Sequence, residues 1–343
     1  MLSRGKLKSS KASSDDIKEA VEIVNAWRVA HSYPLNTFNV NLRKKVRGLK
    51  AVVVAQRLKR MPTILDKLVR EPTMELTNMQ DIGGVRAILK NPKDVYRIVK
   101  KYQNTPNHEL LKEKDYINTP RGSDGYRSYH LTFRYKNNIE SAEQYNGLRI
   151  EVQLRTQLQH KWATAVETMG VILGQQLKSR QGEKEWLEFF CSVSNAFAHI
   201  ENTTLVPGYE SLSRQAAFEL VREKEGRLNA IEKFTAFSRA MEFVNRDGNK
   251  RGRPRQGYYL LKLDLKDHSI VISTYTRDDA TRASTALENL EKQAQNNPNI
   301  DALLVSVGPL DELRKAYPNY FLDVGEFIDQ LRSVIRMADS ANS

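Results

Sequence analysis

The sequence almost lacks cysteine. Cys191 is the single one among 343 residues, which excludes an internal disulfide bond and any zinc site built from cysteines. The six histidines are scattered and show no metal-ligand spacing. No apolar run approaches the roughly 18 residues of a membrane span, and the start, MLSRGKLKSSKASSDD, lacks the apolar core of a secretory signal. We therefore expect a cytoplasmic protein with no membrane partner.

Acidic residues are scarce at the N-terminal end. The whole chain has a formal net charge of +13, and residues 1–70 hold 16 Lys and Arg against 5 Asp and Glu, a net charge of +11. A segment this basic attracts polyanions, so nucleotide phosphates, RNA and acidic proteins are the candidate ligands. The alternative is a solvated basic surface without a ligand.

Helical spacing of apolar residues dominates the first part of the chain. A basic tail precedes SSDDIKEAVEIVNAWRVAHS, a predicted helix with an N-cap serine and early acids. Further helices are predicted at about 39–58 and over PTILDKLVRE. The pattern then changes to strands and helices in the order GGVRAIL (strand), PKDVYRIVKKYQN (helix), YRSYHLTFRY (strand), LRIEVQLRT (strand), QLQHKWATAVETMGVILG (helix) and further helices over 183–245.

A break in composition at NRDGNKRGRPRQG, residues 245–257, separates a smaller C-terminal region. Its pattern predicts a hairpin of YYLLKLDL and HSIVISTY across KD, a helix at about 277–296, a strand ALLVSVG, and helices at about 309–316 and 324–337. The predicted fold is α+β, a mixed or antiparallel sheet flanked by helices plus a small C-terminal α/β domain. The predicted division is 1–34 (basic tail and first helix), 35–245 (main domain with following helices), 246–256 (basic linker) and 257–343 (ββαβα domain, regulatory or partner-binding).

The linker contains the stretch RGRPR, which is similar to the core of a minor-groove AT-hook. One copy is a weak signal. DNA binding, contact with RNA or another phosphate surface, and a solvated linker all stay open for this segment.

Two predicted strands have one apolar and one polar face, since successive side chains of a strand point to opposite sides. In SYHLTFRY the apolar set is Tyr129, Leu131, Phe133 and Tyr135, and in LRIEVQLR it is Leu148, Ile150, Val152 and Leu154. Antiparallel pairing of these strands would bring together the polar residues His130, Glu151, Gln153 and Arg155. An amphipathic sheet with one wet side is the structural alternative.

Three further features favour a binding site. Arg57 and Lys59 lie close together upstream, with Lys67 in the next helix, and Asp81 comes just before a double glycine and a strand that contains Arg86. The loop before YRSYH supplies Lys114, Arg121 and the aromatic Tyr126. Cations, two carboxylates and an aromatic side chain together indicate a site for a nucleotide with Mg²⁺.

These residues occur in motifs that match a known family. RLKR followed by KL, then DIGGVRAI, KDYI with PRGSDGYRSYH, and EVQLRT, in this order, resemble the synthetase domain of RelA/SpoT alarmone enzymes, over about residues 35–200. The resemblance implies a nucleotidyltransferase-like domain. It also implies an ATP-dependent pyrophosphokinase that transfers pyrophosphate from ATP to the 3′ hydroxyl of GDP or GTP, making (p)ppGpp, the alarmone of the stringent response.

The resemblance also assigns roles to single residues. Arg57 and Arg86 would sandwich the adenine, and Lys59 and Lys67 would contact the ATP phosphates. Asp81 and Glu151 would hold Mg²⁺, and Glu151 would help to deprotonate the attacking hydroxyl. On the acceptor side, Tyr126 would stack on the base of the acceptor nucleotide. Its phosphates would be contacted by Lys114, Arg121 and His130. Supporting contacts would come from Gln153 and Arg155.

The chain departs from the family in its architecture. It has no His-Asp pair of a hydrolase half, and it continues for well over a hundred residues after EVQLRT. Some such relatives are similar to toxins that make adenosine alarmones or pyrophosphorylate the 3′ CCA end of tRNA, restrained by an appended domain that responds to a phage protein. This toxin-antitoxin variant, with tRNA and a regulatory protein as partners, is the first alternative. A non-catalytic nucleotide-binding or RNA-binding module is the second, and oligomeric state stays open.

Overall fold

The computed structural model describes residues 13–50, 52–59, 61–104, 108–172, 184–236, 238, 256–264, 269–297, 300–306 and 320–340. The basic tail, all but the last residue of the linker 246–256, and the helix predicted at about 309–316 lie outside these residues. The chain forms two compact units, one of residues 1–119 and 127–157 and one of residues 120–126 and 158–343. None of the described helices is long and apolar enough to cross a membrane.

Two helices open the first unit. Helix α2 (Ser14–Ala30) begins as predicted, with Ser13 as N-cap in a capping box with Asp16. Helix α3 (Ser32–Lys45) ends before strand β1 (Val53–Leu58). The helix predicted at about 39–58 is therefore right only as far as Lys45, and wrong over 53–58. Valine-rich sequence suits a pleated strand, and β1 pairs in antiparallel fashion with β2 over its whole length, which helical spacing alone could not reveal.

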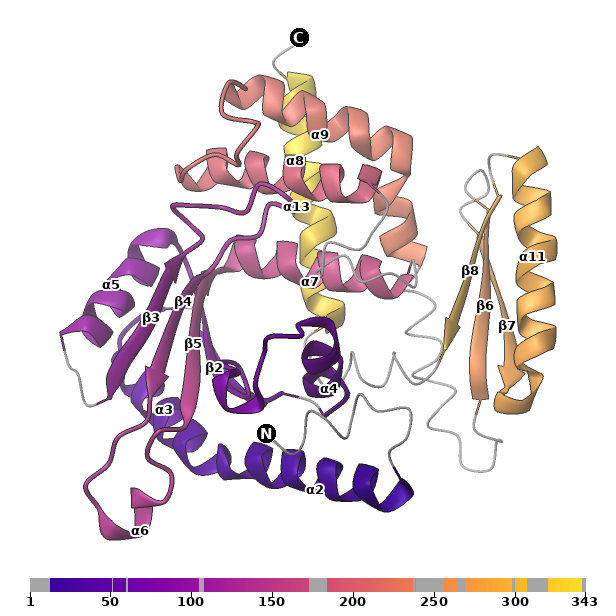
Figure 1. The fold of residues 1–343 in the computed structure, drawn as a ribbon. Helices are drawn as coiled ribbons and strands as arrows, with labels where there is room; N and C mark the ends of the chain where they lie inside the picture. Colours follow the sequence, from indigo (N-terminus) through magenta and orange to yellow (C-terminus); the bar gives the residue numbers. More distant parts are fainter. Residues whose placement is uncertain are drawn as a thin grey trace. The chain divides into compact units, whose positions relative to one another are not determined.

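The first unit is built on a five-stranded mixed sheet (Figure 1). The order is β1, β2 (Gly83–Leu89), β5 (Arg149–Thr156), β4 (Tyr129–Arg134), β3 (Glu109–Asp115). Strands β2 and β5 are parallel and all other neighbours are antiparallel. The predicted α+β class with a mixed sheet is confirmed. Strand β3 was not predicted, because a charged edge strand such as ELLKEKD carries little strand signal of its own.

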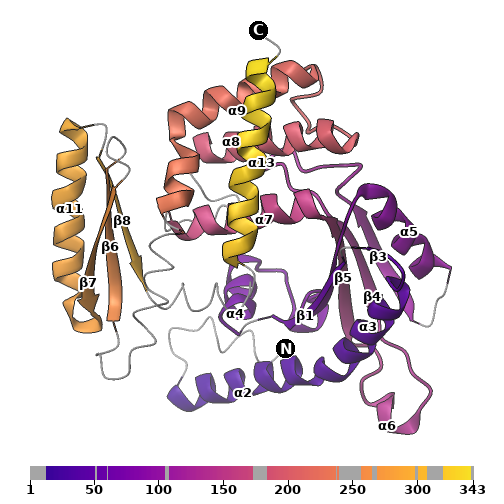
Figure 2. The same cartoon turned by 180° about the vertical axis from the view of Figure 1, so that it is seen from behind.

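One face of this sheet is the core of the unit, and the predicted apolar sets of β4 and β5 are buried on it. Helices α3 and α5 (Pro92–Gln103) pack against that face, with Phe38, Leu42 and Ile98 fully buried (Figure 2). The shorter elements are α4 (Met61–Arg70), a 3-10 turn η1 (Leu76–Asn78) and α6 (Glu140–Glu143). The opposite, polar face is left for the site.

The second unit contains a helical core. It consists of α7 (Gln157–Ile172), α8 (Lys184–Glu201), α9 (Arg214–Leu228) and the last helix, α13 (Tyr320–Ser340). Phe327 of α13 is fully buried, with its ring centroid 5.4 Å from that of Phe234 and 6.3 Å from that of Phe197. The C-terminal helix is therefore part of the core that α8 and α9 form.

Between α9 and α13 the chain forms a three-stranded antiparallel sheet. Its order is β7 (Ser269–Thr276), β6 (Gln256–Asp264), β8 (Ile300–Ser306), and the turn η3 (Arg277–Asp279) leads into helix α11 (Ala280–Asn296). The predicted β6–β7 hairpin is confirmed by its pairing. The predicted boundaries of a separate C-terminal domain stay a prediction, and α13 shares its core with helices on the other side of the linker.

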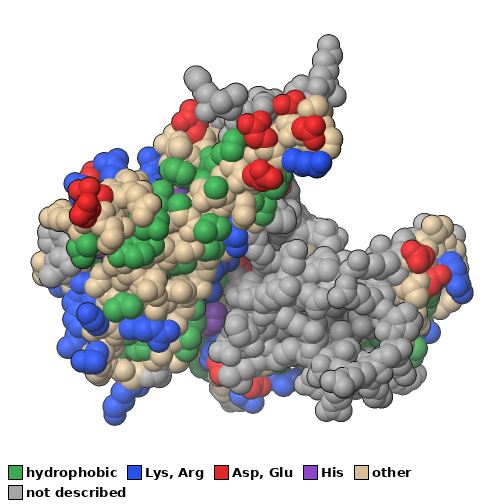
Figure 3. Space-filling model, turned by 90° about the horizontal axis from the view of Figure 1, so that it is seen from below, with side chains coloured by type: hydrophobic (Ala, Val, Ile, Leu, Met, Phe, Trp, Pro, Cys, Tyr) green, Lys and Arg blue, Asp and Glu red, His purple; other side chains and the backbone are tan. Residues whose placement is uncertain are grey.

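The basic character of the chain is visible at its surface. Figure 3 shows Lys and Arg side chains dispersed over one face among hydrophobic and neutral ones, with Asp and Glu in a few smaller groups. This dispersal is typical of a solvated basic surface, so charge on this face does not by itself locate a ligand.

Candidate functional site

Strand register arranges the polar face of the five-stranded sheet in two rows, because paired residues of neighbouring strands point to the same side. The first row, from β1 to β3, is Arg57, Gly84, Glu151, Thr132 and Lys112. The second row is Ala55, Arg86, Gln153, His130 and Lys114. Six of the predicted site residues thus meet on one face, and the predicted pairing of β4 with β5 is confirmed.

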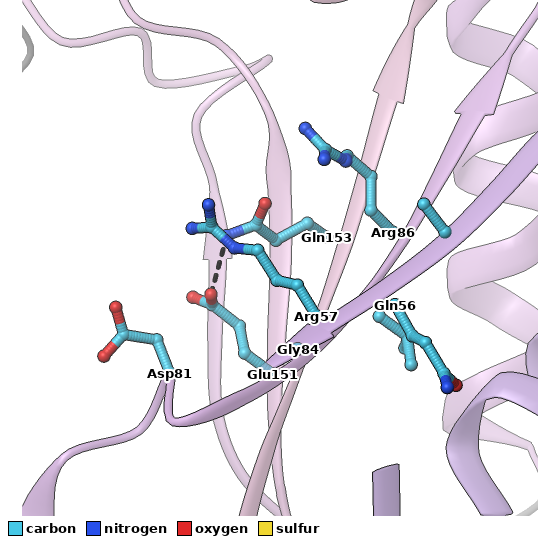
Figure 4. Close-up of a pocket in the computed structure, with 9 residues that line it drawn as sticks. Gln56, Arg57, Asp81, Gly84, Arg86, Glu151 and Gln153 are labelled. Atoms are coloured by element: carbon cyan, nitrogen blue, oxygen red, sulfur yellow. Dashed lines mark hydrogen bonds between the residues drawn. The ribbon is translucent and has the colours of Figure 1, made fainter. Parts of the chain in front are cut away.

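The two rows open into a pocket with an empty volume of about 320 Å³ that is continuous with solvent. It is lined by Ala55, Gln56, Arg57, Asp81, Gly84, Val85, Arg86, Glu151 and Gln153. Figure 4 shows the hydrogen bond between Gln153 and Glu151, with Arg57 and Arg86 projecting from neighbouring strands. Gly84 lies in register between Arg57 and Glu151, and its lack of a side chain leaves the space between them open.

Asp81 lies at the end of the pocket, two residues before β2, and is held by two lysines. Lys59 Nζ donates to Oδ2 at 2.6 Å and Lys67 Nζ donates to Oδ1 at 3.3 Å. Burial acts to raise the pKa of Asp81, but the two ammonium groups outweigh it and keep the pKa below its ordinary value. Asp81 is therefore a carboxylate at neutral pH, and three predicted site residues form one cluster.

Glu151 is held by two neighbours on the sheet. His130 Nδ1 lies 2.9 Å from Oε1 and Gln153 Nε2 donates to Oε2 at 2.6 Å. Burial and the nearby charge of Asp81 act to raise the pKa of Glu151, and the contacts with His130 and Gln153 lower it, so that the net shift is downward. Glu151 is thus also a carboxylate at neutral pH, near enough to Asp81 for the two charges to interact.

The predicted cations differ in their surroundings. Arg57 is exposed on the edge strand β1, while Arg86 is half-buried on β2. Lys114 is exposed, and its Nζ donates to the hydroxyl of Tyr116 at 2.9 Å. The Tyr116 ring meets the His130 ring edge-on at a centroid distance of 5.4 Å. Arg155, by contrast, is buried in β5 with an exposure of only 3%.

Arg121 and Tyr126 fall in the second unit, with the loop 120–126. The Arg121 guanidinium lies over the Tyr126 ring, 4.5 Å from its centroid, and donates through Nε to Asp124 at 3.0 Å. Asp124 is buried and also accepts the backbone N–H of Tyr126 at 3.0 Å. The loop is therefore ordered around an aspartate that was not among the predicted site residues.

Helix α8 anchors the same loop. Ser194 Oγ donates to the carbonyl of Gly125 at 2.6 Å. Gly125 has φ +77°, and a Cβ there would lie 2.8 Å from Ser194 Cβ and 3.1 Å from Cys191 Cα. Only glycine fits this conformation and this close approach without strain. Cys191 is buried beside this loop, and burial raises the pKa of its thiol to about 12.

Three supporting residues were missed by sequence reasoning. Asp124 lies inside the motif PRGSDGYRSYH, and its position two residues before Tyr126 is a signal for an Asx turn. Lys112 would have followed from alternation with Lys114 if β3 had been predicted. Ser194 carries no local signal, because its contact with Gly125 spans 69 residues.

Comparison with known proteins agrees with the motifs. Residues 56–169 match the family described as "Region found in RelA / SpoT proteins", which confirms the predicted resemblance. Two Bacillus subtilis (strain 168) proteins are similar: GTP pyrophosphokinase YwaC is 34% identical over 113 residues, and GTP pyrophosphokinase YjbM is 33% identical over 136. The matches cover 32% and 36% of this chain and 52% and 63% of those relatives, so the chain spans between half and two thirds of their length.

Among solved structures, the small alarmone synthetase 1 from Bacillus subtilis is similar with a TM-score of 0.45 and 22% sequence identity. The match covers 52% of this chain and 92% of that one.

Proposed function

We propose that this chain is a nucleotide pyrophosphokinase that transfers pyrophosphate from ATP to the 3′ hydroxyl of GDP or GTP. The observation that carries the proposal is the pocket in which Asp81, just before β2, lies with Glu151, Arg57 and Arg86 of the sheet, both carboxylates being ionised. In the reaction the acceptor 3′ oxygen forms a bond to the β-phosphorus of ATP. The bond between that phosphorus and the oxygen bridging to the α-phosphate breaks, AMP leaves, and the hydroxyl proton is released.

The residue types suit this chemistry. Phosphoryl transfer needs positioning and charge neutralisation more than a covalent nucleophile. Arg57 and Arg86, on neighbouring strands, would flank the adenine, and Lys59 and Lys67, beside Asp81, would contact the phosphates. Lys114 and His130 would meet the acceptor phosphates, with Gln153 and Arg155 in support, and Tyr126 with Arg121 would receive the acceptor base and its phosphates.

The donor set also fits Mg²⁺, which favours oxygen ligands and is usually bound by one or two carboxylates together with substrate phosphates. Asp81 and Glu151 would hold the ion. Among the described residues no three His, Cys, Asp or Glu side chains form a metal-binding group, so nucleotide oxygens and water would complete its coordination. When bound, the ion would neutralise charge on the transferring pyrophosphate. Glu151, kept ionised by His130 and Gln153, can accept the proton of the attacking hydroxyl.

The test is an acceptor assay. Purified chain is incubated with ATP labelled in its γ-phosphate, Mg²⁺, and in turn GDP, GTP, ADP or deacylated tRNA. We expect label in a guanosine product and AMP released in equal amount. If only ADP or only tRNA becomes labelled, the acceptor is that molecule and not a guanosine nucleotide, which favours the toxin alternative. Label in none of them would overturn the proposal.

A Glu151→Gln variant separates catalysis from binding, because the amide keeps the shape but is an uncharged, weaker metal ligand and cannot accept a proton. We expect transfer to fall by at least about 100-fold, while the thermal unfolding temperature stays near that of the original chain. A non-catalytic nucleotide-binding module would bind ATP without transfer in either form.

A further inference from the structure

The last turn of helix α2 packs against every segment that carries the Asp81 cluster. Trp27 contacts the apolar cluster that contains Ile64 and Leu68 of α4 and Met79 and Ile82 of the segment before β2. Lys67 belongs to α4, and Asp81 lies between Met79 and Ile82 in the chain. None of the sequence motifs includes α2, yet this helix packs against both the segment that carries Lys67 and the segment that carries Asp81.

Arg28, on the same turn, fixes the backbone of Lys59. The Arg28 Nε donates to the Lys59 carbonyl at 2.8 Å, and the Lys59 N–H donates to the Ile82 carbonyl at 2.7 Å. Both backbone polar groups of Lys59 are therefore engaged where the chain passes from β1 to α4. The direction of its side chain toward Asp81 depends on these two contacts, because the Cα–Cβ bond follows the backbone.

The helix junction also packs on the start of β2. A Cβ on Gly83 would lie 3.5 Å from His31 Cβ and 2.7 Å from Ile150 Cδ1, so the α2–α3 junction meets the strand backbone directly. His31 is buried, and its Nδ1 lies 2.7 Å from the Trp27 carbonyl, a contact that ties the junction to the last turn of α2. The position of Arg28 relative to β2 is thus fixed by packing.

We propose that Arg28 is a positioning residue of the nucleotide site, which holds Lys59 in place for the phosphates of ATP. The proposal rests on the proposed function. A charge-assisted hydrogen bond in a half-buried setting is strong enough to bias a backbone conformation. Small displacements of a positioning group can lower rates by up to about 100-fold.

The test compares Arg28→Ala with Arg43→Ala. Arg43 is a matched control, because its Nη2 donates to the carbonyl of Val54 at 3.3 Å. Val54 lies near the start of β1, whereas Lys59 follows the end of that strand. For Arg28→Ala we expect the KM for ATP to rise about tenfold, with the KM for GDP unchanged and a thermal unfolding temperature like that of the control. Arg28→Lys, which keeps a donor, should recover part of the loss.

A double-variant cycle identifies the route of the effect. In a Lys59→Met background, Arg28→Ala should change the KM for ATP less than twofold, if Arg28 acts through Lys59. An undiminished tenfold effect in that background would overturn the proposal. So would an Arg28→Ala enzyme that matches Arg43→Ala in all parameters, or one whose KM values for both substrates rise together.

Affinity for a non-hydrolysable ATP analogue with Mg²⁺, measured by fluorescence titration, gives a readout that needs no transfer. Arg28→Ala should weaken it about tenfold, and Arg43→Ala should not. If the original chain binds the analogue but transfers nothing, the proposed function fails while the role of Arg28 is still tested. If Arg28→Ala binds the analogue as well as the original chain does, the role of Arg28 is overturned.

Discussion

The two regions that carry the predicted site residues are held by different forces. On the five-stranded sheet, Asp81 and Glu151 are fixed by ionic and polar contacts with Lys59, Lys67, His130 and Gln153. The loop 120–126 is ordered within itself by Asp124, which pairs with Arg121, and it is attached to α8 by the close packing of Gly125. Charge therefore holds the first region in place, whereas close packing attaches the second region to its helix.

This difference predicts different weaknesses. An ionic cluster tolerates a change of side-chain length better than a change of charge, and it responds to pH. A packed contact responds to a single added methyl group and is indifferent to pH in the neutral range. The following variants test this contrast, in order of decreasing expected effect.

The helical core that includes α8, on which the loop packs, also includes α13. Phe327→Ala removes a fully buried ring that contacts Phe197 of α8, and should lower the free energy of unfolding by about 3–5 kcal/mol. Urea unfolding measures this. Arg222→Ala is the control, because its pair with Asp339 of α13 is largely exposed and should contribute less than about 1 kcal/mol. Equal small losses for both would show that α13 does not stabilise this core.

Gly125→Ala combines two penalties at the loop. The residue has φ +77°, and the new Cβ would lie 2.8 Å from Ser194 Cβ, so we expect a loss of about 2–4 kcal/mol and a raised KM for the acceptor. Gly147→Ala is matched in backbone, with φ +91° and nothing within 4 Å of the new Cβ. It should lose only about 1–2 kcal/mol. If the two variants behave alike, close packing on α8 does not hold the loop.

The ionic region should respond to pH. Because the folded pKa of Asp81 lies below its value in the unfolded chain, its ion pairs stabilise the fold above about pH 4, and this stabilisation is lost as the pH falls through the folded pKa. Lys59→Met should therefore cost about 1–2 kcal/mol at pH 7 and progressively less toward pH 3. Denaturant unfolding of the original chain and of Lys59→Met at several pH values measures the difference in their free energies of unfolding.

The control for this series is Lys18→Met, since the contact of Lys18 with Asp15 is exposed, at 3.6 Å. It should change the stability by less than about 1 kcal/mol at either pH. If the stability loss caused by Lys59→Met stays constant from pH 7 to pH 3, the contribution of Lys59 is not ionic.

Much of the ionic region was predictable, because strand alternation is a local property. The sets Tyr129 to Tyr135 and Leu148 to Leu154 alternate in the sequence, and they are buried as the pattern predicts. The same alternation assigned His130, Glu151 and Gln153 to one face. Helical spacing failed at 53–58, which form a strand that pairs with β2 over its whole length.

The sequence by itself determined the local periodicities, the charge excess and the motifs, since each is written in residues that are close along the chain. Tertiary structure alone decided which backbone Arg28 would hold, that Gly125 would lie on α8, and that α13 would share a core with Phe197 and Phe234. The physical reason is that these contacts join residues from 31 to 130 positions apart. At such separations no periodicity links the partners, and only the packing of complementary surfaces selects them.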